Sequence, residues 1–222
     1  MNLTRKKTLL LLFLTYTIIS YSLYQFLVIF PPSKTLGDSY RLFFFHIPTP
    51  LVAFFAFTVT LFSSILYLKT ADLKWDDLAS SSVKLGFIFS ALAMVTGWVF
   101  TYEAWNTTWS WDMKVVTMFI LCFLYLGYFT LRQATFDPVR KARTSAIYGI
   151  MAYLSIPLTY MSSRMWISLH PGGSIGLTPD MEIVAGLMVI GFMALYAYLL
   201  WFEVTYKKLE QRYASLVREA DT

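Results

Sequence analysis

The residues best able to do chemistry in this sequence are its two histidines, because imidazole binds metals and exchanges protons near neutral pH. His46 directly precedes a long apolar run, in FFFHIPTP, and His170 lies in WISLHPGGS. Between them in the sequence comes WNTTWSWDMK, in which three tryptophans are followed by an acidic and a basic residue: Trp105, Trp109, Trp111, Asp112 and Lys114. Whether these features act together depends on how the apolar runs between them are arranged.

Those apolar runs predict an all-α integral membrane protein. The chain has 222 residues, of which 57% are apolar and 14% charged. A soluble domain of this size could not bury so much apolar surface. A helix needs about 20 apolar residues to cross the hydrocarbon core, and an unpaired strand cannot cross it. Six predicted spans form one membrane domain over residues 1–222, at about 8–30, 47–68, 84–101, 115–131, 146–161 and 183–202.

The distribution of lysine and arginine predicts the orientation of the bundle. If both termini and the even-numbered loops share one side, that side carries 14 of the 18 basic residues. Basic residues accumulate on the cytoplasmic side, so we expect both termini there. The tryptophan-rich loop 102–114 and both histidines then fall on the outer side. The tail 203–222 has apolar residues at helical spacing and is expected to extend the last span as a cytoplasmic helix.

Prolines and capping residues predict where the helices begin and end. Asp137-Pro138 and Thr178-Pro179 are typical of helix starts, and Pro48 fits a first helical turn. Pro31-Pro32 is expected to end the first span, and Pro157 to kink the fifth. The stretch LKWDDLASSSVK, residues 73–84, is expected to be a short polar loop.

Two imidazoles beside a tryptophan-rich platform suit a flat, apolar ligand that carries a metal, and haem fits that description. Two neutral histidines can occupy both axial positions of its iron, and indole rings can stack on the porphyrin. Basic side chains on the same side could pair with the propionates: Arg41, Lys114 and Arg164. Simpler interpretations remain open, because histidine and tryptophan are also common at membrane interfaces, and Asp112 could serve only as a helix cap.

Other chemistry has little support in the sequence. The single cysteine, Cys122, lies within a span, and no C-x-x-C-H motif for covalent haem attachment is present. Phosphate-binding and hydrolase motifs are also missing, so no enzymatic activity is predicted. The net charge of +5 follows the membrane bias and does not predict nucleic-acid binding. A b-type cytochrome that moves electrons across the membrane would generally need about four axial ligands, more than two outer histidines supply.

Three stretches resemble the CcmC family of haem-handling membrane proteins, within the group that carries a tryptophan-rich WWD domain. They are GDSYRLFFFHIPTP, VTGWVFTYEAWNTTWSWDMK and SIPLTYMSSRMWISLHPGGSI. The loop motif of the family reads roughly W-G-x-W-W-x-W-D. Its matches here are Trp105, Trp109, Trp111 and Asp112, while Asn106 and Thr108 depart from it. In the third stretch, Trp166 stands where the family often has two tryptophans.

The resemblance implies a function in cytochrome c biogenesis at the prokaryotic plasma membrane. It implies that haem b is held without a covalent bond on the outer face, with His46 and His170 as axial ligands. The implied partners are a haem chaperone of the CcmE type, the subunits of an ABC transporter, a small accessory membrane subunit and the lipid bilayer. A b-type electron carrier and a docking subunit that binds no haem are the alternatives.

Overall fold

The computed structural model describes residues 3–33, 36–107, 111–168, 170 and 177–220, and every regular element in these ranges is a helix. The order is α1 (Leu3–Tyr24), η1 (Gln25–Ile29), η2 (Asp38–Arg41), α2 (Leu42–His46), α3 (Pro48–Thr70), α4 (Leu73–Trp105), α5 (Met113–Ala134), α6 (Pro138–Ala152), α7 (Ser155–Met165) and α8 (Pro179–Ala220). The prediction of an all-α protein is therefore confirmed for the described residues.

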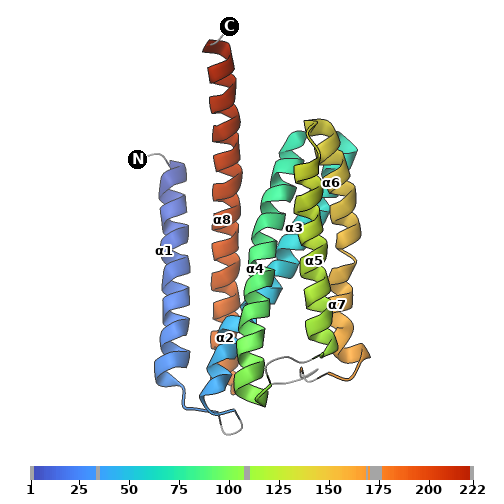
Figure 1. Cartoon of the computed structure of the whole chain (residues 1–222). Helices are drawn as coiled ribbons and strands as arrows, with labels where there is room; N and C mark the ends of the chain where they lie inside the picture. The colour runs from blue at the N-terminus through green and yellow to red at the C-terminus, as the bar shows by residue number, and fades with distance from the viewer. Residues whose placement is uncertain (1–2, 34–35, 108–110, 169, 171–176, 221–222) are drawn as a thin grey trace.

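The long helices form an elongated bundle, in which α1 lies beside α8 and the helices α3 to α7 form a second group (Figure 1). Both chain ends lie at one end of this bundle, together with the α3–α4 and α5–α6 turns. The opposite end carries α2, the end of α4, the start of α5 and the end of α7. The described features singled out in the sequence, His46, residues 102–107 and 111–114, and His170, thus share the end away from the termini.

Five stretches of helix are long and apolar enough to cross a membrane: Thr8–Ile29, Asp38–Thr70, Leu73–Ala104, Met113–Ala134 and Pro179–Ala220. The predicted fifth span, 146–161, is divided between the shorter helices α6 and α7, which follow each other along the bundle (Figure 1). The helix is interrupted between them by a turn at Tyr153 and Leu154. Pro157 explains the break, because it offers no N–H to the Tyr153 carbonyl four residues earlier.

The predicted helix ends agree with the structure at several positions. The side chain of Asp137 caps α6 by accepting a hydrogen bond from the Arg140 N–H at 2.7 Å, and Pro138 follows it as the first helical residue. Pro48 likewise opens α3. The helix formed by α1 and η1 ends at Phe30, directly before Pro31-Pro32. Local chemistry therefore sets these boundaries, as expected for caps and prolines.

The prediction of a polar loop over residues 73–84 is wrong, because this stretch forms the first turns of α4. Several of its polar side chains find partners inside the protein. Ser82 is fully buried and donates its hydroxyl hydrogen to the Ala56 carbonyl oxygen at 2.6 Å, and Asp76 pairs with Arg132. A polar stretch can be helical in a bundle when neighbouring helices satisfy its hydrogen bonds.

The packing of α3, α4 and α5 fixes the walls of the candidate site. The ring of Phe57 on α3 stacks on that of Tyr125 on α5, with centroids 3.5 Å apart and planes 8° from parallel. Gly86 lets α4 approach the same ring, since a Cβ atom there would lie 2.8 Å from a Phe57 ring carbon. Close packing of this kind leaves little freedom for the helices to slide.

Candidate functional site

Both histidines line one cavity at the end of the bundle away from the termini. Its volume is about 80 Å³, and Lys114 also contributes to its wall. The remaining lining residues are mostly apolar and come from α3, α4, α5 and α7: Pro50, Phe54, Ala93, Met94, Gly97, Trp98, Thr101, Val115, Met118 and Thr159. The structure thus brings together two imidazoles that lie more than 120 positions apart in the sequence.

His46 is held by α4. Its Nδ1 lies 3.0 Å from Oγ1 of Thr96, and that hydroxyl donates its own hydrogen to the Leu92 carbonyl oxygen at 2.8 Å. With that hydrogen on the Leu92 carbonyl oxygen, the hydroxyl accepts from His46, and the ring proton in this arrangement is on Nδ1. The neutral ring then carries its lone pair on Nε2, the atom that can bind a metal.

Gly97 lets the His46 ring lie against α4. A Cβ atom built on Gly97 would be 3.0 Å from Cε1 and 3.6 Å from Nδ1 of the imidazole. A larger residue would therefore displace the ring. The main chain of His46 is held as well, because its carbonyl oxygen accepts the Thr49 hydroxyl hydrogen at 2.8 Å.

His170 is held by Asp112, which begins α5. Asp112 is 8% exposed, and its Oδ1 lies 3.2 Å from Nδ1 of His170. The same oxygen accepts hydrogen bonds from the Ser168 hydroxyl at 3.0 Å and from the Lys114 N–H at 2.9 Å. An ionised carboxylate only accepts, so the ring proton of His170 is on Nδ1 and the lone pair on Nε2.

Asp112 therefore caps a helix and also orients a histidine. The prediction of a capping role is confirmed, whereas its contact with His170 was not expected from the sequence. A carboxylate on the second ring nitrogen of a metal-binding histidine fixes the ring and raises its basicity. His170 has this arrangement, whereas His46 has the Thr96 hydroxyl at the corresponding nitrogen.

Burial lowers the pKa of His170 below its ordinary 6.5, and the carboxylate of Asp112 opposes this shift without cancelling it. Burial acts in this direction because a partly dry site disfavours the charged imidazolium. His170 is therefore neutral at pH 7, which is the form that binds a metal.

Two basic side chains meet beside the cavity at Tyr160. Nζ of Lys114 donates to the Tyr160 carbonyl oxygen at 3.2 Å, and the guanidinium of Arg164 lies over the tyrosine ring, 4.9 Å from its centroid. Lys114 lines the cavity, while Arg164 is exposed at the end of α7. Lys114 therefore places positive charge beside the two histidines, and Arg164 adds a second cation at Tyr160.

Arg41 has a different environment. Its guanidinium donates to the carbonyl oxygens of Phe26 and Phe30 at the end of the first helix, and it pairs with Asp38 at 2.8 Å. Arg41 is not among the described residues that line the cavity. The Arg41 side chain therefore links the end of the first helix to η2.

The predicted tryptophans are only partly described. Trp111 is 82% exposed next to Asp112, and Trp166 is 43% exposed where α7 ends. Neither lines the cavity as the structure describes it. Trp105 is the last residue of α4, but its side chain, like the whole of Trp109, lies outside the described residues.

The structure adds cavity residues that the sequence interpretation missed. Trp98, which was not singled out in the sequence, lines the cavity. Its spacing offered a signal, since the α4 lining positions follow the periodicity of one helical face: Ala93, Met94, Gly97, Trp98 and Thr101. The importance of Gly97 and Thr96 had no such signal, because it depends on where His46 lies.

Comparisons with known proteins identify the family of the chain. The model of the CcmC family, described as heme exporter protein C, matches residues 1–221. The chain belongs to this family. The sequence resemblance to CcmC proteins is thus confirmed, and the chain is a multi-pass membrane protein of that family.

Curated relatives cover most of the chain. The heme exporter protein C of Bradyrhizobium diazoefficiens is 27% identical over 208 residues, which are 91% of this chain and 79% of the relative. The heme exporter protein C of Haemophilus influenzae is 28% identical over 198 residues, which are 84% of this chain and 78% of the relative. A ccmC-like mitochondrial protein of Marchantia polymorpha, whose name places it provisionally in cytochrome c biosynthesis, is 25% identical over 69% of this chain and 65% of its own length.

Proposed function

We propose that this CcmC-family protein binds haem at the end of the bundle away from its termini and passes it on for cytochrome c biogenesis. His46 and His170 are the axial ligands in this proposal. The observation that carries it is that both imidazoles line one largely apolar cavity, each with Nδ1 held by an acceptor. The names of the relatives, which describe heme export and cytochrome c biosynthesis, support the same function.

The size of the cavity suits a ligand that is held at its mouth. A volume of about 80 Å³ is well below the roughly 300–1,000 Å³ of pockets that enclose drug-sized ligands. A porphyrin would therefore remain largely outside the cavity, where the indole ring of Trp98 offers it an apolar surface. Trp105, Trp109, Trp111 and Trp166 remain predicted stacking partners.

The charges beside the cavity suit the propionates of haem. Lys114 lines the cavity with His170, and Arg164 lies over the Tyr160 ring that Lys114 also contacts, so two cations are available, one for each carboxylate. Arg41, which was also predicted for this role, is less suitable because the Phe26 and Phe30 carbonyl oxygens and Asp38 occupy its donors.

Such a site favours transfer over storage. Two histidine bonds and a shallow contact hold haem without a covalent link, so another protein can remove it. We propose that the recipient is a haem chaperone of the CcmE type, and that the subunits of an ABC transporter and a small accessory membrane subunit act with it.

We further propose that the chain crosses the membrane six times, with α6 and α7 together forming one crossing and both termini in the cytoplasm. The support comes from the basic residues, of which 14 of 18 belong to the end of the bundle that carries the termini. The histidine cavity then opens on the outer face of the prokaryotic plasma membrane.

The test is an absorption spectrum of the detergent-purified protein titrated with haem, for wild type, His46→Gly and His170→Gly. Wild type is expected to give a low-spin bis-histidine spectrum, and each variant a weaker, altered one. Adding free imidazole should restore the wild-type spectrum in both variants, because it can replace the missing ligand in a folded protein.

Two results would count against the proposal. If wild type binds no haem, a docking subunit becomes the better description. If haem binds and neither variant changes the spectrum, the ligands lie elsewhere, and Met94 and Met118 of the cavity wall are the next to replace.

A further inference from the structure

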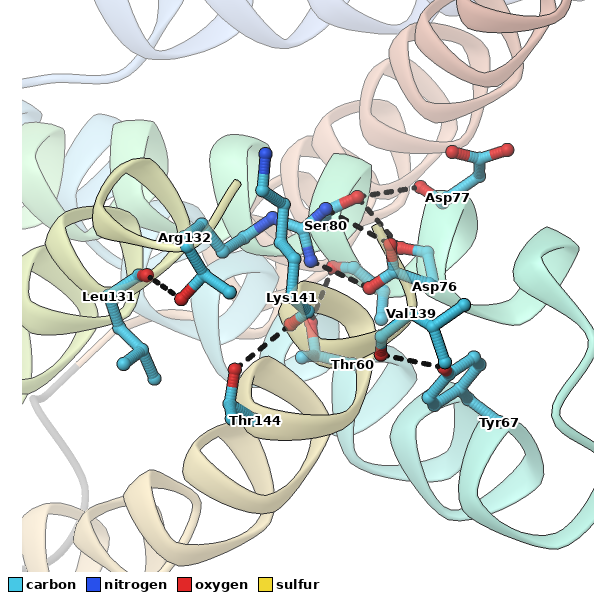
Figure 2. A network of polar contacts seen from close by, with 12 residues as sticks. Thr60, Tyr67, Asp76, Asp77, Ser80, Leu131, Arg132, Val139, Lys141 and Thr144 are labelled. Carbon is cyan, nitrogen blue, oxygen red and sulfur yellow. Dashed lines mark hydrogen bonds and ion pairs between the residues drawn. The ribbon is translucent and has the colours of Figure 1, made fainter. Parts of the chain in front are cut away.

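A second cavity, of about 320 Å³, lies at the end of the bundle that carries the termini. Four helices each contribute one cation to its wall: Lys84 from α4, Arg132 from α5, Lys141 from α6 and Lys207 from α8. The other lining residues are Ser80, Phe129, Gln133 and Glu203. Figure 2 shows part of this region, with Arg132, Lys141 and Ser80 close together.

One cation of this cavity is held firmly by a carboxylate. Arg132 makes two hydrogen bonds to Asp76 of α4, at 2.6 Å and 3.0 Å (Figure 2). A two-point contact between a guanidinium and a carboxylate fixes the orientation of both groups. Arg132 is thus positioned before any ligand arrives.

The α8 side of the cavity is attached to α4. Nζ of Lys207 donates to the Ser80 hydroxyl oxygen at 2.7 Å and to the Asp77 carbonyl oxygen at 3.4 Å. Lys84 pairs with Glu203 at 2.9 Å. Both hydrogen-bond acceptors of Lys207 are uncharged, and within the described part of the chain no carboxylate lies close enough to form an ion pair with it, although the charge of Asp77 attracts it from nearby.

Lys141 is even less engaged. Among the described residues its side chain has no hydrogen bond or ion pair, although it is partly buried. The wall carries four cations against one carboxylate, Glu203, and Asp76 and Asp77 beside it supply two more negative charges. One positive charge therefore remains in excess, and Lys141 and Lys207 form no ion pair among the described residues. Unpaired cations in such a place are costly unless an anion joins them.

We propose that this cavity binds a phosphate group, with Lys141 and Lys207 as its principal contacts and Arg132 as a third donor. Phosphate has several strong acceptor oxygens and suits cations that converge from different helices. Basic pockets between membrane helices at the cytoplasmic side are where anionic headgroups bind. The phosphate belongs either to an anionic phospholipid or to a small soluble compound, and the site is independent of the proposed haem function.

The experiment compares delipidated protein in neutral detergent with and without added phosphatidylglycerol, phosphatidylcholine or glycerol 3-phosphate, at equal ionic strength. Retention of lipid in native mass spectrometry and the melting temperature are measured. The variants are Lys207→Gln and Lys141→Gln. The matched control is Lys208→Gln, which removes the exposed neighbour of Lys207 from the same helix.

We expect phosphatidylglycerol, but not phosphatidylcholine, to bind and to raise the melting temperature. Each cavity variant should weaken binding by about five-fold or more, as the loss of one cation beside an anionic lipid predicts. Lys208→Gln should leave binding unchanged. If glycerol 3-phosphate reproduces this pattern, the ligand is a soluble phosphate compound.

The proposal is overturned if neither phosphate source binds. It is also overturned if Lys208→Gln weakens binding as much as Lys207→Gln, because the attraction would then belong to the whole basic surface. Weaker binding by Lys141→Gln cannot be attributed to misfolding, because the Lys141 side chain makes no hydrogen bond or ion pair within the described residues that the substitution would remove.

Discussion

Replacing Asp112 with asparagine separates its two tasks. Asparagine caps helices about as well as aspartate, so the amide oxygen can still accept the Lys114 N–H that is bonded at 2.9 Å. What Asp112→Asn removes is the negative charge that faces Nδ1 of His170 at 3.2 Å. The fold should therefore persist while the basicity of the imidazole falls.

The size of the effect follows from the position of this carboxylate behind a proposed metal ligand. Losing such a partner typically weakens metal binding by about 10- to 100-fold. This range corresponds to about 1.4–2.8 kcal/mol of binding free energy. The change in unfolding free energy should be a few tenths of a kcal/mol, because the cap is kept.

The assay is a haem titration in detergent, followed by absorption, with the melting temperature measured on the same samples. Asp137→Asn is the matched control, since Asp137 caps α6 through the Arg140 N–H and lies at the other end of the bundle. We expect the dissociation constant for haem to rise at least ten-fold in Asp112→Asn and less than two-fold in the control.

The reasoning is refuted if Asp112→Asn binds haem as tightly as wild type while keeping its melting temperature. Equal losses of affinity in both variants would also refute it, because a general effect of weakened caps would then suffice.

Three further results are expected at the same site. Gly97→Ala should weaken haem binding several-fold, because the added Cβ would lie 3.0 Å from the His46 ring. The melting temperature should not fall, because alanine is more favourable than glycine in a helix by up to about 1 kcal/mol. Trp98→Ala should weaken haem binding, whereas Trp201→Ala should not, because Trp201 lies on α8, is similarly exposed and is not among the described lining residues; haem titration of both variants tests this. The haem affinity should be level from pH 8 down to 6.5 and fall only in more acid solution. The reason is that burial lowers the pKa of His170 and only the neutral ring binds iron. A loss of affinity that begins above pH 6.5 would contradict this.

The helix boundaries show how much local sequence can predict. Asp112, Asp137, Pro48 and Pro157 all act within about one turn of themselves, through a capping oxygen, a fixed backbone angle or a missing N–H. Their effects could therefore be predicted without knowing any distant contact. Long apolar runs predicted the all-α class for the same reason, because a helix makes its backbone hydrogen bonds within its own segment.

The stretch 73–84 shows where that approach fails. Its serines and aspartates are typical of a loop, yet Ser82 and Asp76 are buried in α4 and bonded to α3 and α5. Whether a polar residue belongs in a loop or in a buried helix depends on partners supplied by other helices. No pattern within the stretch itself contains that information.

The sequence by itself determined that the chain is helical and membrane-embedded, and it singled out His46 and His170. Only the tertiary structure decided that the two histidines line one cavity, that Thr96 and Asp112 hold their Nδ1 atoms, and that Arg41 is engaged elsewhere. The physical reason is separation along the chain. Helix formation and capping act over a few residues, whereas the histidine contacts join residues 50 and 58 positions apart, and Arg41 contacts the end of another helix 11 and 15 positions earlier. Such contacts exist only once the helices have packed.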